Sequence, residues 1–192
     1  MSSLADREKQ LLLQLARNAL TRAVRHLSPL REFVVEEIFH QPGGAFVTLH
    51  RRGRLRGCVG QLPGRDELVE VVAHCARAAA LNDSRFDPVV SAELSEIEIE
   101  LSVLSPLQDV TLEQIEAGKH GLVVSQGGHR GVLLPQVARE FKWPAQRFLE
   151  ETCVKAGFAR DAWRDPATRV QAFTAEVFSE AAFPPAANAQ RD

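Results

Sequence analysis

The stretch AFVTLHRRGRLRGCVGQL, residues 45–62, decides the fold because it predicts a β-hairpin. Residues 45–50 (AFVTLH) and 55–62 (LRGCVGQL) have the composition of strands, and the charged segment between them contains a glycine suited to a turn. Two strands joined by so short a turn run antiparallel. The sequence therefore indicates an antiparallel sheet.

Cys58 is the candidate functional residue of this hairpin. Residues two apart on a strand share a face, so Arg56 and Cys58 are expected to project together. Nearby positive charge favours a thiolate over a thiol. Gly57 and Gly60 leave the backbone beside the sulfur open to a ligand or another chain. The alternative is a glycine-kinked strand whose cysteine fills a small gap, and the sequence leaves both interpretations open.

The clearest single strand is EIEIELSVL, residues 96–104, whose strict alternation turns its apolar residues inward and Glu96, Glu98, Glu100 and Ser102 outward. Residues 30–44 are ambiguous between a strand and a helical turn. Ser3 is expected to cap the first helix. The sequence pattern predicts helices over residues 4–27, 66–81, 111–117, 135–142 and 145–156. It also predicts one last strand over 170–178 and a second hairpin, from 121–126 to 130–134, through Gly127 and Gly128.

This order of elements predicts an α+β fold, in which an antiparallel sheet is flanked by helices, rather than a doubly wound sheet. A chain of 192 residues suits one domain, or one domain with a smaller lobe. The tail 184–192 is rich in Ala, Pro and Asn and is expected to be disordered.

Composition and charge exclude several classes of function. The net charge is −2 and no long Lys/Arg tract occurs, which argues against nucleic-acid binding. No apolar run approaches the ~20 residues that span a bilayer, and charges interrupt the N-terminal segment where a signal peptide would need an apolar core. The three cysteines lack zinc spacing, so we expect free thiols, a cytoplasmic location, and no metal or cofactor.

Three further positions outside the hairpin carry candidate chemistry. In the polar loop NDSRFDP, residues 82–88, Asp83 or Asp87 could pair with Arg85 to hold the loop, or Arg85 could bind an anionic group. His120 enters a strand and could transfer protons or serve only as a hydrogen-bonded structural group. Gln136 stands in the first turn of a helix and could orient a ligand or cap the helix. Cys75 and Cys153 are expected in the core.

Several segments together resemble the AMMECR family, whose bacterial and archaeal members are often labelled protein A of the AmmeMemoRadiSam system. The resemblance covers about Leu11 to Phe178, with Val59 where the family usually has Ile, and residues 183–192 have no counterpart. The matching segments are FVTLHRRGRLRGCVGQL (46–62), NDSRFDP (82–88), IEIELSVLS (97–105), GKHGLVV (118–124) and LLPQVAREFKWPAQRFLEETCVKAGF (133–158).

The resemblance implies a single AMMECR-type domain over residues 1–183. Its larger lobe would comprise about 1–118 and 166–183, and its smaller lobe, about 119–165, would carry a short antiparallel sheet of its own. A groove between the lobes would receive Cys58 from one side and His120 or Gln136 from the other. The family has no settled activity. Its genomic setting implies a Memo-like protein and a radical SAM enzyme as partners.

Two hypotheses from different classes, and a third interpretation, follow. In an enzyme, Cys58 would be a nucleophile, Arg56 would lower its pKa, and His120 would move protons. In a binding protein, the same groove would receive a small ligand or a protein, and Arg56 and Arg85 would contact an anionic group. The third interpretation is an adaptor that stabilises the Memo-like protein or the radical SAM enzyme. The candidate ligand contacts are Arg56, Gly57, Gly60, Asn82, Asp83, Arg85 and Gln136.

Overall fold

The computed structural model describes residues 3–28 and 37–183 and divides the chain into two compact units. The first unit comprises Met1–Val103 and Glu176–Asp192, and the second comprises Leu104–Ala175. The second unit therefore begins earlier and ends later along the chain than residues 119–165 of the expected smaller lobe. The expected tail 184–192 and residues 30–36 of the ambiguous segment lie outside the described residues.

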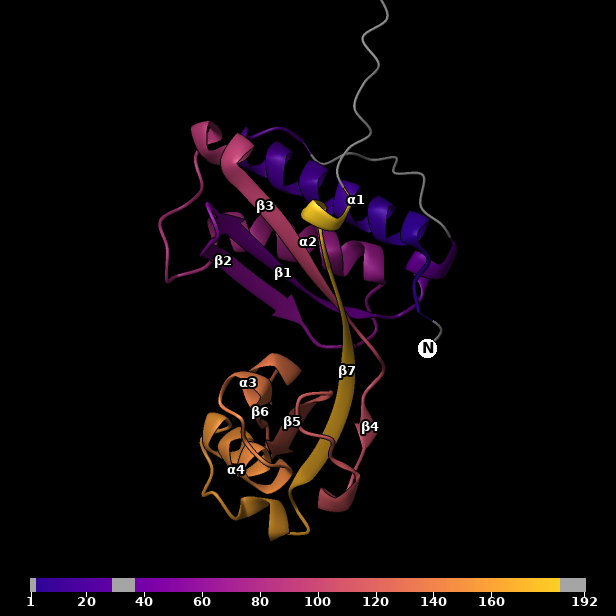
Figure 1. Ribbon diagram of the computed structural model, residues 1–192, viewed down its shortest axis with the longest axis vertical. Helices are drawn as coiled ribbons and strands as arrows, with labels where there is room; N and C mark the ends of the chain where they lie inside the picture. The colour runs from indigo at the N-terminus through magenta and orange to yellow at the C-terminus, as the bar shows by residue number, and fades with distance from the viewer. Residues whose placement is uncertain (1–2, 29–36, 184–192) are drawn as a thin grey trace, which may run out of the picture. The chain divides into compact units, whose positions relative to one another are not determined.

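The first unit packs two helices on one face of its strands, as Figure 1 shows. An apolar core fills the space between these helices and the strands. Short 3₁₀ turns at Glu37–His40, Ser91–Glu96 and Glu180–Ala182 connect the elements. The helices are α1 (Asp6–Val24) and α2 (Leu68–Leu81), and the strands are β1 (Gly44–Arg51), β2 (Arg54–Gln61) and β3 (Ile97–Leu104).

The predicted hairpin is confirmed. β1 and β2 pair antiparallel and end on Arg51 opposite Arg54. The two residues between them, Arg52 and Gly53, have φ values of 51° and 73°, as a type I′ turn requires. The pairing shifts between Leu49 and His50, which face Gly57 and Leu55, so β2 contains one extra residue, Arg56. Arg56 is therefore a β-bulge.

The inward residues of β3 confirm the alternation predicted for residues 96–104, with one exception on the outer face. The inward residues Ile97, Ile99, Leu101 and Val103 are all buried. Cys75 of α2 is a core residue, as expected. Ser102, expected on the outer face of β3, is only 3% exposed. A period of two shows which side chains share a face, but it does not show whether something covers that face.

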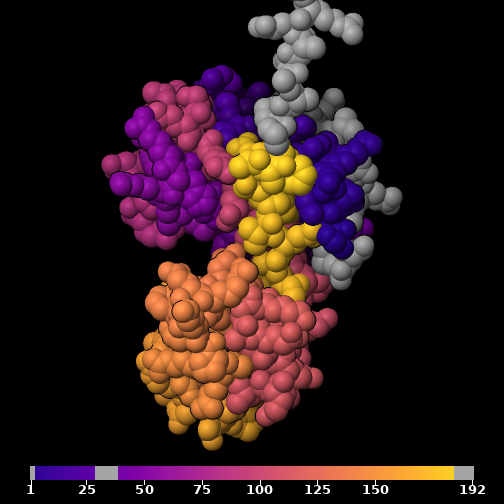
Figure 2. Space-filling model, viewed as in Figure 1, coloured from indigo at the N-terminus to yellow at the C-terminus, as the bar shows by residue number. Residues whose placement is uncertain are grey.

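Residues 3 and 4 contact the last strand within the first unit. Ser3 does not cap α1; its Oγ donates to Glu176 Oε1 over 2.7 Å, and Glu176 also accepts from the Leu4 amide. The amide that would need a cap, that of Ala5, donates instead to the Glu8 carboxylate at 2.6 Å. Figure 2 shows the C-terminal segment in yellow beside α1 in indigo.

The second unit contains a hairpin covered by two short helices, with a core of its own that includes Cys153. The turn between its strands is Gly127-Gly128, both with positive φ, as predicted. The expected helix 111–117 is wrong: only Leu112–Gln114 forms a 3₁₀ turn, because so short a segment rarely sustains an α-helix. The elements are β4 (Gln108–Asp109), β5 (His120–Gln126), β6 (His129–Leu133), α3 (Pro135–Glu140) and α4 (Ala145–Lys155).

The last strand, β7 (Arg169–Ser179), crosses the boundary between the two units. The strand order is β2-β1-β3-β7-β5-β6, with β4 also paired to β7. Antiparallel pairing holds in both hairpins and between β7 and its partners β4 and β5. The predicted α+β class, with an antiparallel sheet flanked by helices, is confirmed.

Candidate functional site

Cys58 lies on the edge of the sheet, because β2 is the outermost strand in the order. Its backbone amide donates to Asp83 Oδ2 over 2.8 Å, and its carbonyl accepts from Arg85 Nη2 over 3.3 Å. Alternate residues of an antiparallel edge strand point both backbone groups outward. Asp83 and Arg85 thus occupy the positions that a neighbouring strand would fill, and we call this pair the edge clasp.

The edge clasp is held together by a forked ion pair. Arg85 Nε and Nη2 donate to the two Asp83 oxygens over 2.9 and 2.7 Å, and the Arg85 amide donates to Oδ1 over 3.2 Å. The Asp83 side chain is 7% exposed and that of Arg85 is 56% exposed. The Arg85 hydrogen bonds and, to a smaller degree, the Cys58 amide hold the pKa of Asp83 well below its usual range. Of the two expected partners for Arg85, the structure selects Asp83.

Arg56 binds Glu93, whereas Cys58 is the partner expected from the sequence. Its Nε and Nη2 donate to the two Glu93 oxygens over 3.0 and 2.9 Å, and its Nη1 donates to the Asp87 carbonyl over 2.9 Å. These hydrogen bonds are the first cause of a Glu93 pKa lowered to about 2. A bulge re-aims the side chain it carries. The sequence pattern assumed a regular strand and could not reveal this.

The cation associated with Cys58 is instead Arg85. The pKa of Arg85 is raised, first by Asp83 and, more weakly, by Cys58. The Cys58 sulfur accepts a hydrogen bond from the Thr48 hydroxyl over 3.4 Å, and the residue is half-buried. Cys75 and Cys153 are fully buried, and burial raises the pKa of Cys75 to about 11. Cys58 is therefore the one cysteine of the chain with an accessible surface.

Both glycines of the motif make room for other parts of the same unit. A Cβ atom at Gly57 would stand 2.2 Å from the Ala79 carbonyl oxygen of α2, and one at Gly60 would stand 2.0 Å from the Phe46 ring. The backbone is approached closely at these positions, as expected, but the approaching groups belong to the protein itself.

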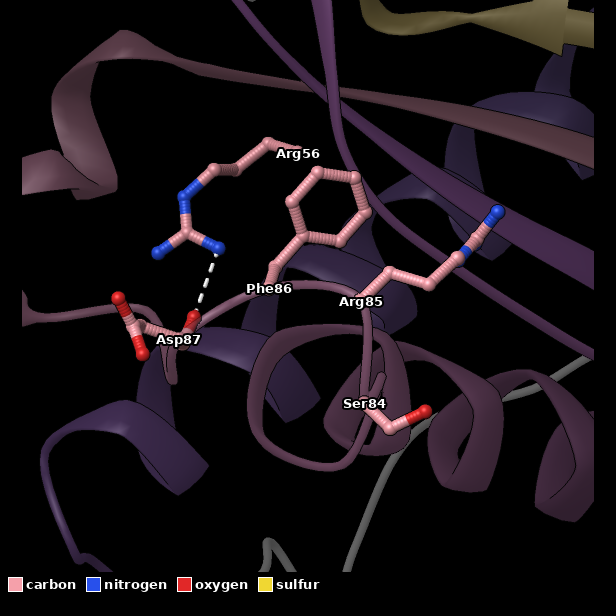
Figure 3. Close-up of a pocket in the computed structure, with 5 residues that line it drawn as sticks. All are labelled: Arg56, Ser84, Arg85, Phe86 and Asp87. Atoms are coloured by element: carbon pink, nitrogen blue, oxygen red, sulfur yellow. Dashed lines mark hydrogen bonds between the residues drawn. The ribbon is translucent and has the colours of Figure 1, made fainter.

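A hollow of about 460 Å³ opens beside β2, where two segments distant in sequence meet. Arg56 comes from β2, and the other wall is formed by the loop after α2. Figure 3 shows the Phe86 ring between the Arg56 and Arg85 side chains, with the Arg85 guanidinium 5.5 Å from the ring centroid. Ser84 and Phe86 were not among the candidate residues, although both belong to the quoted segment NDSRFDP. The lining residues are Arg56, Ser84, Arg85, Phe86 and Asp87.

The remaining candidates are not among the residues that line the hollow. Asn82 is exposed at the end of α2. His120 and Gln136 belong to the second unit. His120 Nδ1 accepts a hydrogen bond from the Glu116 amide over 3.1 Å, which places the proton of the neutral ring on Nε2. The Gln136 side-chain oxygen is buried and has no hydrogen-bond partner within the described residues.

Residues 3–28 and 37–183 include no group of three His, Cys, Asp or Glu side chains arranged to hold a metal ion. Within the same ranges, no helix combines the length and apolar character needed to cross a bilayer.

A family model for AMMECR1 matches residues 13–178, which include both walls of the hollow. The chain belongs to the AMMECR1 family. A relative from Methanothermobacter thermautotrophicus is 40% identical over 90% of this chain and 94% of its own length. A second, from Thermococcus kodakarensis, is 39% identical over 94% of both chains.

The chain is similar in structure to an uncharacterised protein from Pyrococcus horikoshii, which is known from a crystal structure. It superposes with a TM-score of 0.83 and 35% sequence identity, and the match covers 92% of this chain and 93% of that one. The expected family membership is thus confirmed.

Proposed function

We propose that this protein binds a small molecule in the hollow beside β2. The observation that carries the proposal is the convergence of the two segments LRGCVG and NDSRFDP, which lie apart in the sequence, on one hollow of about 460 Å³. A hollow of this volume has room for a small ligand, and its wall is mostly polar, with Phe86 as its aromatic residue.

The geometry favours binding over a nucleophilic role for Cys58. A thiol becomes a strong nucleophile through a neighbouring base or through a cation that stabilises the thiolate. The nearby cation, Arg85, is already paired with Asp83. The hydrogen bond at the Cys58 sulfur comes from Thr48, whose hydroxyl does not serve as a base near neutral pH. Arg85 connects the hollow with Cys58 through the edge clasp, so we place the thiol next to the ligand rather than at the centre of a reaction.

This proposal depends on first-unit residues alone. Arg56, Arg85 and Phe86 form its wall, and Asn82 is a further candidate contact at the start of the loop. Asp83 forms an ion pair with Arg85 outside the hollow, and its side chain is nearly buried. Gly57 and Gly60 shape the strand. The roles suggested for His120 and Gln136 concern the second unit and are not required.

The test is a binding screen by amide NMR with a panel of small carboxylates, phosphates and amines. We expect at least one probe to shift the amide signals of residues 84–87, and Phe86→Ala to abolish the shift. Arg54→Ala is the matched control, because Arg54 is exposed on the same strand and does not line the hollow. Shifts confined to other regions, or shifts that persist in Phe86→Ala, would contradict the proposal.

A second candidate function is that of a cytoplasmic adaptor for a Memo-like protein and a radical SAM enzyme. It is favoured by the contacts of the motif within its own unit: Ala79 and Phe46 lie against Gly57 and Gly60, and the edge clasp binds the backbone of Cys58. The adaptor should co-purify with at least one of these partners, and Phe86→Ala should leave that association intact. Failure to co-purify with either partner would reject it.

A further inference from the structure

Both arginines of the hollow are already paired with carboxylates outside it, and Arg56 shares its partner Glu93 with Arg51. Arg56 forms a forked pair with Glu93, and Arg85 forms one with Asp83. Neither carboxylate lines the hollow. Arg51 and Arg52, which pair with Glu96 and in part with Glu93, do not line it either. In each guanidinium Nε and Nη2 are committed to one carboxylate, which leaves only Nη1 for an anionic ligand, and Arg56 Nη1 already donates to the Asp87 carbonyl.

The charged group that remains unmatched in the wall is the Asp87 carboxylate. Figure 3 shows that Arg56 reaches Asp87 through the backbone oxygen, over 2.9 Å, while the carboxylate stays clear of this hydrogen bond. Asp87 is exposed, and its carboxylate has no hydrogen bond or ion pair with any residue in 3–28 or 37–183. The next residue toward the N-terminus, Phe86, contributes a half-buried aromatic ring to the same wall.

We infer that the hollow selects a cationic group, an ammonium or a guanidinium attached to a small apolar body, and not the anion that its two arginines suggest. The Asp87 carboxylate accepts the N–H groups of the cation, and the Phe86 ring, over which the Arg85 guanidinium already lies at 5.5 Å, contacts the apolar body. Carboxylates and aromatic faces are the usual partners of such cations in proteins. Ser84 adds a hydroxyl to the same wall.

This inference rests on the proposed function, because it names the ligand class of the same hollow. Its test uses methylguanidinium chloride and tetramethylammonium chloride, with sodium acetate and sodium phosphate as anionic probes at matched ionic strength. The cations should shift the amide signals of residues 84–87. Asp87→Asn should weaken their binding about fivefold to tenfold, a factor expected for one partly solvated ionic contact.

Glu98→Gln is the control, because Glu98 is an exposed carboxylate of the same unit outside the hollow. It should bind the cations as the wild type does. If acetate or phosphate binds at residues 84–87 and the cations do not, the inference is overturned while the proposed function stands. If none of the probes of the wider panel binds there, both fail. Equal weakening by Asp87→Asn and Glu98→Gln would show a general charge effect and would also overturn the inference.

Discussion

Gly57 lies where β2 crosses the end of α2, and its missing side chain is a packing requirement. A Cβ atom there would stand 2.2 Å from a backbone oxygen, that of Ala79, which cannot move aside as a flexible side chain could. We therefore expect Gly57→Ala to lower the free energy of unfolding by about 1–3 kcal/mol, the usual cost of overpacking, measured by urea titration.

Gly64→Ala is the matched control for this prediction. The nearest heavy atom to a Cβ at Gly64 is 3.9 Å away, an ordinary contact distance. The substitution should leave stability unchanged or raise it slightly, because alanine restricts the unfolded chain. Equal stability of the two variants would show that β2 and α2 do not approach as closely as described.

The cysteines should differ sharply in their accessibility to alkylation. Cys58 is half-buried, whereas Cys75 and Cys153 have no exposed surface. In the native protein, iodoacetamide should modify Cys58 and react with the other two at least about a hundredfold more slowly, because they require the fold to open. Peptide mass spectrometry provides the measurement. Denatured protein is the control, in which the three thiols should react at similar rates. If the three thiols also react at similar rates in the native protein, Cys75 and Cys153 are not buried.

Single residues show the limit of sequence reasoning about the site. Cys58 and the segment around Arg85 are recognisable from their neighbours in sequence, and both lie at or next to the hollow. The two-residue periodicity predicts Arg56 as the partner of Cys58, but a β-bulge at Arg56 interrupts that periodicity and Arg85 contacts Cys58 instead. The bulge depends on the register against β1, which no local pattern specifies.

At the scale of elements, β2 is an edge strand whose backbone is bound by the edge clasp and whose Arg56 side chain is bound by Glu93. The edge clasp satisfies the outward amide and carbonyl of Cys58, and Glu93, in the 3₁₀ turn Ser91–Glu96, binds Arg56 and Arg51 from the hairpin. An edge strand with open backbone groups would invite pairing with another chain, so these contacts also protect the sheet.

Glu93 makes the attachment of the hairpin sensitive to acid. Its pKa falls from 4.5 in the unfolded chain to about 2 in the fold, so its contribution to stability is complete above about pH 5 and is lost as the pH falls from about 4.5 toward about 2. Glu93→Gln should be about 1–3 kcal/mol less stable at neutral pH, since it leaves partly buried arginine donors poorly paired. It should also lose less stability than the wild type between about pH 5 and pH 3.

Urea unfolding across that pH range measures the effect. Glu98→Gln, on the exposed side of β3, should follow the wild type at every pH. Parallel pH profiles for the wild type and Glu93→Gln would show that the ion pairs with Arg56 and Arg51 do not stabilise the fold.

At the scale of the whole molecule, the two units differ in how the chain builds them. The second unit is continuous, Leu104–Ala175, and the first requires residues 176–183 in addition to its N-terminal part. Glu180 illustrates this dependence: it pairs with Arg17 of α1 and accepts the Ile99 amide of β3 over 2.9 Å. Residues 176–183 are therefore part of the first unit's structure.

The continuous unit should fold in isolation. A fragment of residues 104–175 retains its own apolar core, and the Ser105 amide and hydroxyl bond to Thr174, so its two ends are tied together. We expect dispersed amide NMR signals and a cooperative thermal transition from this fragment. The same fragment with Leu149→Asp, a charge placed in the core, should be unfolded and serves as the control. An unfolded wild-type fragment would contradict the division into two units.

The sequence by itself determined the α+β class, both hairpins, most helices and the two segments that meet at the hollow. These depend on local spacing and turn chemistry, which act between residues close in the chain. Only the tertiary structure decided that Asp83 and Arg85 cap Cys58, that Glu93 captures Arg56, and that Asp87 keeps an unmatched charge. Such pairings join residues separated by tens of positions, and they are set by strand register and by a bulge, which periodicity does not encode.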